Sequence, residues 1–162
     1  APNVVNIYET YKLQTPSKWT LSGSYIFDKK GLLSVDFTKK NYGNTRCKPT
    51  NDDVFNTINT QIDLNLQNAY ELRIGGEYKI KQWSIRGGYR FEQSPYKVDV
   101  AFGDLMSYSS GLGYNFGNSK LDISYTNENR ERTEALLTSG LNDTARIKNK
   151  NNNVTLTYVV NF

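Results

Sequence analysis

Residues 70–91 have the sequence YELRIGGEYKIKQWSIRGGYRF, and its pattern indicates the fold most clearly. Apolar and polar side chains alternate along both of its halves, and only Lys81 and Gln82 separate the two. Strict alternation is typical of a β-strand whose two faces meet different surroundings, and so short a separation predicts an antiparallel hairpin. One face of this hairpin is apolar and carries Tyr70, Leu72, Ile74, Tyr78, Ile80, Trp83, Ile85, Tyr89 and Phe91.

The opposite face of the hairpin is charged. Opposite charges on neighbouring strands can pair across a hairpin, and charges inside a membrane protein face an interior or a cavity. If the sheet spans a membrane, the polar face lines a lumen. Such a cluster either stabilises the lumen wall or binds a ligand or a plugging domain, and wall packing is the simpler interpretation. The predicted lumen-facing cluster is Glu71, Arg73, Glu77, Lys79, Arg86 and Arg90.

The same alternation recurs along the chain and predicts eight strands in all. Besides the hairpin, we expect strands at 8–13, 19–27, 33–37, 108–116, 121–125 and 154–162. Short turns are expected at 28–31, 81–82 and 117–120, the first with Gly31 in the left-handed conformation. Long polar loops are expected at 41–61, 92–104 and 127–152. Long loops at one end and short turns at the other are typical of outer-membrane barrels, although a soluble sandwich also alternates.

Aromatic residues gather at the ends of the predicted strands. Leu, Ile and Val dominate the middle of the strands, as in Leu33, Val35 and Ile74. Two aromatic girdles around an aliphatic band are what the interfaces of a bilayer select, whereas β-propensity alone does not sort aromatics to strand ends. The long-loop girdle would contain Trp19, Tyr42, Tyr70, Phe91 and Tyr108, and the short-turn girdle Phe27, Tyr78, Trp83, Tyr114, Phe116 and Phe162. The pattern favours an antiparallel transmembrane β-barrel.

The chain ends on VTLTYVVNF, residues 154–162, with an apolar residue at every second position and a terminal aromatic. This ending resembles the signal that the outer-membrane insertase reads on the last strand of a barrel. We predict an insertase-recognition strand formed by Leu156, Tyr158, Val160 and Phe162.

Composition argues against an enzyme and against a nucleic-acid partner. The chain has 162 residues, no histidine and one cysteine, Cys47, so the usual His-dependent catalytic sites and an internal disulfide are excluded. The net charge of +4 is spread along turns and alternating positions, unlike the clustered basic surface of a nucleic-acid-binding protein. No cofactor and no metal are expected.

Three stretches carry a resemblance to a known family. YKLQTPSKWTLSGSYIFDKKGLLSVDFTKKNYGN, AYELRIGGEYKIKQWSIRGGYRFEQSPYK and YSSGLGYNFGNSKLDISY follow one another at residues 11–44, 69–97 and 108–125. In their order and spacing they resemble the FadL/TodX family of outer-membrane proteins. The resemblance covers most of residues 8–126 and the terminal strand.

The resemblance implies a fourteen-stranded barrel plugged by a hatch, which takes up long-chain fatty acids or other hydrophobic compounds across the bacterial outer membrane. Residues 1–162 would then be one barrel segment, the C-terminal part, without the hatch domain. The implied partners are the lipid bilayer, the insertase during assembly, hydrophobic small molecules, detergent or lipid, and the rest of the barrel or other outer-membrane proteins. The alternative is a structural or interaction barrel, either a small eight-stranded protein or a subunit of a larger outer-membrane assembly.

Overall fold

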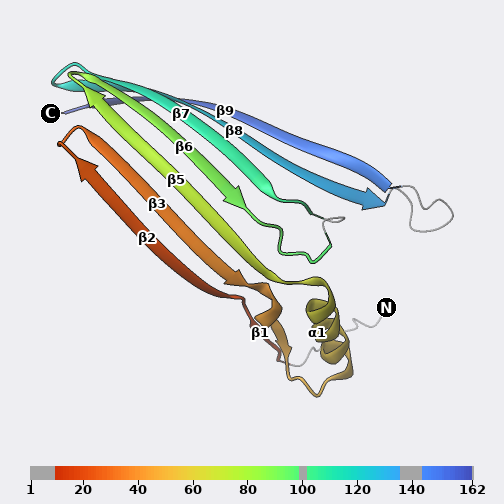
Figure 1. Cartoon of the computed structure of the whole chain (residues 1–162). Coiled ribbons are helices and arrows are strands. Elements are labelled where there is room, and N and C mark those ends of the chain that lie inside the picture. The colour runs from red at the N-terminus through yellow and green to blue at the C-terminus, as the bar shows by residue number, and fades with distance from the viewer. Residues whose placement is uncertain (1–9, 99–101, 136–143, 162) are drawn as a thin grey trace, which may run out of the picture.

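A large antiparallel sheet dominates the computed structural model, which describes residues 10–98, 102–135 and 144–161 (Figure 1). Within these ranges seven strands follow one another in sequence order, so each pairs with its neighbour in the chain. The strands are β2 (Ser17–Phe27), β3 (Gly31–Asn41), β5 (Asn68–Ile80), β6 (Trp83–Glu92), β7 (Leu105–Asn115), β8 (Ser119–Ala135) and β9 (Thr144–Val160). The sheet is curved but open, with β2 and β9 at its edges.

The hairpin at 70–91 is formed as predicted. Tyr78 lies opposite Ile85 on one face, and Glu77 lies opposite Arg86 on the other. The register runs without interruption from Glu71–Glu92 to Ile80–Trp83, so every second residue of β5 and β6 shares a face.

The apolar face of the sheet is solvent-accessible across all seven strands. Leu21, Ile74, Ile123 and Leu156 each expose between 39 and 67% of their surface. Among the described residues only Ala69 and Leu105 are buried hydrophobic residues, which is far too little for the core of a soluble protein. A continuous apolar face of this kind needs a nonpolar environment. The described residues contain no helix of the length and apolar character needed to cross a membrane.

Several aromatic residues of the apolar face lie near the strand ends as expected, whereas Tyr42 lies in a 3₁₀ turn outside the sheet and Tyr108 lies opposite Tyr89 in the row of Ile74. At the short-turn end the rings of Phe27 and Tyr78 are 6.5 Å apart, and those of Trp83 and Tyr114 are 4.7 Å apart. Toward the long-loop end the ring of Tyr70 stacks on that of Phe37 at 5.8 Å. Phe162 lies outside the described residues.

The expected first strand at 8–13 is wrong as a member of the main sheet over residues 10–13, and residues 8 and 9 lie outside the described residues. Instead β1 (Lys12–Gln14) pairs with β4 (Arg46–Lys48), which lies within the expected loop 41–61, and the two form a separate small sheet. The main sheet therefore has seven described strands, where eight were predicted. Alternation over six residues shows that a segment can be a strand, but it does not show which strand it pairs with.

The expected loop 41–61 is also largely structured. After a 3₁₀ turn, η1 (Tyr42–Asn44), it includes most of the helix α1 (Asp53–Asn65). The side chain of Asp52 accepts hydrogen bonds from the backbone N–H groups of Val54 and Phe55 and so caps this helix. The signal was present in the sequence as an acidic residue before the spaced apolar positions of residues 54–64.

The longest expected loop, 127–152, is wrong over most of its length. Strands β8 and β9 are 17 residues each and remain paired up to Ala135 and Thr144. The halves of these strands toward Ala135 and Thr144 are mostly polar on both faces, with Ala145 and Ile147 as apolar exceptions, so the alternation is weak there, although the backbone hydrogen bonds of a sheet do not require it.

The turn between β2 and β3 forms at the predicted place with different geometry. The positive φ angles belong to Asp28 (49°) and Lys29 (52°), not to Gly31, as in the two-residue turns that suit the twist of a hairpin. Gly31 instead lies directly under the ring of Phe27, where a side chain would overlap the aromatic ring.

Cys47 tests the orientation of the chain, because β4 belongs to the long-loop end. Its thiol is free and half-buried, and its backbone exchanges hydrogen bonds of 2.8 and 2.9 Å with the side chain of Asn59. If the long loops face the cell exterior, an impermeant maleimide will label Cys47 slowly on intact cells. In a Cys47→Ser background, Lys81→Cys at a short turn should be labelled only after the outer membrane is opened. The reverse pattern would invert the orientation.

Candidate functional site: the polar inner face

All six predicted cluster residues lie on the polar face of β5 and β6. Glu77 and Arg86 are directly opposite one another, whereas Arg73 lies opposite Arg90. Like charges directly opposite are destabilising, so the second pair needs carboxylates from elsewhere on the same face. The structure supplies them in two groups, one toward each end of the sheet.

The group at the long-loop end is centred on Glu71, whose side chain is only 6% exposed. Its carboxylate accepts hydrogen bonds from the Nε atoms of Arg73 (2.6 Å) and Arg90 (2.9 Å), and Lys40 Nζ lies 3.5 Å away. Arg90 also donates to Glu92 at 2.6 Å. The Glu71 carboxylate holds the two arginines in place despite their mutual repulsion, because both guanidinium groups donate hydrogen bonds to it.

The group at the short-turn end is centred on Arg86. Its Nε donates to Glu77 at 2.5 Å and its Nη1 donates to Asp122 of β8 at 2.6 Å. Lys79 and Lys120 add further contacts to these two carboxylates, at 3.4 and 3.0 Å. This group therefore joins β5, β6 and β8, although β7 lies between β6 and β8.

Gly113 of β7 makes the contact between Arg86 and Asp122 possible. A Cβ atom at this position would overlap the Asp122 carboxylate and would lie 3.5 Å from the Arg86 guanidinium. The regular register at Gly113 shows no bulge. The glycine thus provides room for a charge pair that crosses its strand.

Small residues separate the two charged groups. Ser34, Gly75, Gly88 and Ser109 lie side by side in one row across four strands. With Ser24, Thr126 and Asn153 the row extends across all seven strands of the sheet. A hollow of about 560 Å³ lies over this part of the inner face. The middle of the inner face therefore carries no long side chain.

The cluster predicted from the sequence is incomplete. Lys40, Glu92, Asp122, Lys120 and Arg130 belong to the same two groups but were not predicted. Each of these residues is charged and lies at an inward position of its strand. The sequence alone could not group them, because the register that places these positions side by side is known only from the structure.

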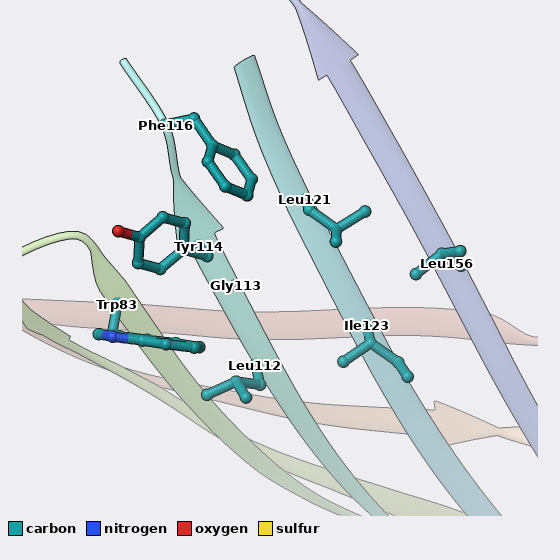
Figure 2. A pocket seen from close by; sticks show the side chains of 8 residues that line it. All are labelled: Trp83, Leu112, Gly113, Tyr114, Phe116, Leu121, Ile123 and Leu156. Carbon is teal, nitrogen blue, oxygen red and sulfur yellow. The ribbon is translucent and has the colours of Figure 1, made fainter. Parts of the chain in front are cut away.

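A second hollow lies on the apolar outer face, at the short-turn end, and has a volume of about 610 Å³ (Figure 2). The aromatic rings of Trp83, Tyr114 and Phe116 lie along one side of it, and Leu121, Ile123 and Leu156 lie on the neighbouring strands. Because it opens on the face that carries the girdles, this hollow belongs to the lipid-contacting surface and not to the inner face.

The fluorescence of Trp83 can test whether this surface contacts lipid. The chain has two tryptophans, Trp19 and Trp83, and both lie on the outer face with 58 and 45% of their surface exposed. In a Trp19→Phe variant reconstituted into bilayers, we expect brominated phospholipids to quench the fluorescence of Trp83 strongly and aqueous iodide to quench it weakly. Strong iodide quenching without bromine quenching would contradict contact with lipid.

The predicted insertase-recognition residues Leu156, Tyr158 and Val160 lie on the outer face of the edge strand β9, with 67, 63 and 45% of their surface exposed. They form one row, and Phe162 lies beyond the described residues.

If the natural protein ends at Phe162, deleting this residue should leave less heat-modifiable protein in the outer membrane, because the aromatic residue of the predicted recognition strand would no longer be available to the insertase. The measurement is the folded fraction on unheated gels. A matched Asn161→Ala variant should assemble normally, and normal assembly of the truncated chain would contradict the role of Phe162.

An open, two-faced antiparallel sheet with an apolar outer face and a charged inner face defines an outer-membrane β-barrel protein. Residues 5–162 match the family model described as "Outer membrane protein transport protein (OMPP1/FadL/TodX)". The chain therefore belongs to the OMPP1/FadL/TodX family of outer-membrane transport proteins. Members of this family are located in the bacterial outer membrane and are not enzymes.

Among solved structures, the chain is similar to a crystal structure of a Pseudomonas aeruginosa FadL homologue. The TM-score is 0.53 at 18% sequence identity, and the match covers 88% of this chain. It covers 34% of the solved chain, so the present chain spans about a third of the length of that protein. No curated protein matches the chain significantly in sequence. The likeness confirms the predicted antiparallel barrel fold, of which the described residues form an open part.

Proposed function

We propose that residues 1–162 form one segment of the wall of an outer-membrane channel that takes up hydrophobic compounds such as long-chain fatty acids. The observation that carries the proposal is the sheet itself: its outer face suits lipid, its inner face suits water, and both of its edges are open. Membership of a transport family supports the general activity, and the class of substrate is the proposed part.

The open edges argue for a wall segment within a larger barrel. Every backbone polar group within a bilayer must be hydrogen-bonded, so a sheet that spans it must close. In the described residues β2 and β9 each have one strand neighbour in the main sheet. A small eight-stranded barrel would use residues 8–13 as its remaining strand, but β1 pairs with β4 instead. Further strands, from the rest of the barrel, would complete the ladder.

The charged cluster serves, in this proposal, as a structural part of the lumen wall. Each of the central side chains Glu71, Glu77 and Arg86 has at least two oppositely charged partners on the same face. Charges that are satisfied within the sheet are poorly available to a ligand. The row of small residues between the two groups provides the free space for a passing compound or a plug.

Uptake of a labelled long-chain fatty acid by cells that lack the natural gene tests the proposal. We expect the full-length gene to restore this uptake and to leave the entry of a small hydrophilic solute unchanged. Failure to restore it, with normal assembly, would overturn the proposed substrate class and would favour a structural role.

Two double variants test whether the transported compound passes along the inner face of the sheet. Ser34→Trp combined with Ser109→Trp fills the middle of the inner face, whereas Leu33→Trp combined with Ser110→Trp adds the same groups to the outer face. We expect the inner pair to lower uptake several-fold and the outer pair to leave it close to normal. Equal uptake by the two would contradict transport along this face.

A further inference from the structure

The hairpin of β8 and β9 extends beyond the start of β7, which pairs with β8 only as far as Arg130 (Figure 1). Its register is continuous from Ser119–Val160 to Ala135–Thr144. Because no bulge interrupts it, every even-numbered residue of β9 lies on the outer face of the sheet. The same face of β9 therefore continues from the apolar residues that would contact the bilayer to the polar residues that would lie outside it.

The character of that outer face changes sharply along β9. Val154, Leu156, Tyr158 and Val160 belong to the apolar band, and Asn152 follows as the first polar residue. Above it come three cationic side chains at every second position: Lys150, Lys148 and Arg146. At a rise of about 3.4 Å per residue, they lie roughly 13 to 27 Å from Val154 along the strand. Their distance from Val154 along the membrane normal is smaller, because the strands of a barrel are tilted.

The positive charge of this surface is only partly compensated. Glu131 of β8 lies opposite Lys148 and forms ion pairs with Lys148 (3.2 Å) and Arg146. Lys150 lies opposite Asn129 and has no ion pair within 4.0 Å among the described residues. The side chains of Arg146 and Lys148 are 68 and 70% exposed. Glu131 thus compensates two of the three cations, and all three remain accessible.

An ordered set of amides lies between the cations and the apolar band. The hydroxyl of Tyr125 and the Nδ2 atom of Asn127 both donate to Asn152 Oδ1, at 2.8 and 2.7 Å. Asn129 Nδ2 donates to Asn127 Oδ1 at 2.6 Å. Asparagine and tyrosine groups held in place in this way are suited to hydrogen bonds with sugar hydroxyls, since each has both donor and acceptor capacity.

We infer that the outer face of the β8–β9 hairpin binds the phosphorylated saccharide headgroup of an outer-leaflet glycolipid, that is, a lipopolysaccharide. Arg146, Lys148 and Lys150 contact its phosphates, the amide row contacts its sugars, and its acyl chains lie on the apolar band below. Three cations spread over about 13 Å of strand suit a tall saccharide headgroup with several phosphates better than a single phospholipid phosphate. The surface is independent of the transport path, because it lies on the opposite face of the sheet.

The test uses the natural full-length protein, extracted from the outer membrane in mild detergent. The bound glycolipid is quantified per protein by mass spectrometry, and its affinity is measured by titrating purified lipopolysaccharide. We expect Arg146→Gln/Lys148→Gln/Lys150→Gln to weaken binding at least roughly tenfold, since each cation near an anionic lipid surface contributes to the attraction. The matched control, Lys29→Gln/Lys30→Gln/Lys81→Gln, removes three charges at the short-turn end and should bind normally.

Two further measurements test glycolipid binding by this hairpin even if the triple variant fails to assemble. Glu131→Gln removes the compensating carboxylate, so it should bind the glycolipid more tightly than the unmodified protein. Enzymatically dephosphorylated lipopolysaccharide should compete poorly for the unmodified protein. Equal losses in both triple variants, equal competition by the dephosphorylated lipid, or unchanged binding by Glu131→Gln would each overturn the inference.

Discussion

Ile74→Arg is expected to destabilise the membrane-inserted protein by about 2–4 kcal/mol, the cost of an arginine on the lipid face of a barrel near the bilayer midplane. Ile74 lies on the outer face of β5, four residues from Tyr70 and four from Tyr78, and 39% of its surface is exposed. It is therefore midway between the two aromatic girdles. The measurement is the free energy of unfolding from vesicles, together with the heat-modifiable fraction in the outer membrane.

A matched control separates the membrane effect from a general effect of arginine. Ser34→Arg adds the same side chain on the inner face, opposite Gly75, the neighbour of Ile74. We expect this variant to insert almost normally, because the added charge lies in the lumen. Equal destabilisation by the two would contradict the assignment of the faces.

Ile85→Arg should cost less than Ile74→Arg. Ile85 is also on the outer face, but it lies two residues from Trp83 of the short-turn girdle and six from Phe91. The cost of a charge falls toward the interface, so the two isoleucines, which look equivalent in the sequence, are distinguished by their depth.

Glu71→Gln is expected to lower the free energy of unfolding by about 2 kcal/mol, between the values for surface and for fully buried ion pairs. The substitution leaves Arg73, Arg90 and Lys40 close together with one carboxylate fewer. Repulsion between Arg73 and Arg90, which face each other across the hairpin, is then offset only by Glu92 beside Arg90. The measurement is denaturant unfolding of the natural protein in vesicles or detergent.

The matched control is Glu134→Gln, which removes an exposed carboxylate whose one ion-pair partner among the described residues is Arg132, at 3.4 Å. We expect a change below about 0.5 kcal/mol there. A similar small effect at Glu71 would mean that the inner-face charges do not stabilise the wall.

Much of the main sheet could be predicted from the sequence because alternation is a local property. The hairpin at 70–91 has only one way to bury or expose its apolar positions, so its faces, its turn at residues 81–82 and its charged side follow directly. The polar halves of β8 and β9 could not be predicted in the same way. They extend beyond the apolar band, and both of their faces are mostly polar.

The class of protein, the two faces of the sheet and six of the charged residues on its inner side can be inferred from the sequence alone, because each of these depends on side chains two positions apart in one strand. The pairing of the strands becomes visible in the folded chain. There β1 lies against β4, and Asp122 contacts Arg86 across Gly113 over a separation of 36 residues. The side-chain pattern of one strand specifies which residues share a face, but it does not specify which distant strand lies beside it, because the backbone hydrogen bonds between strands do not depend on side-chain identity.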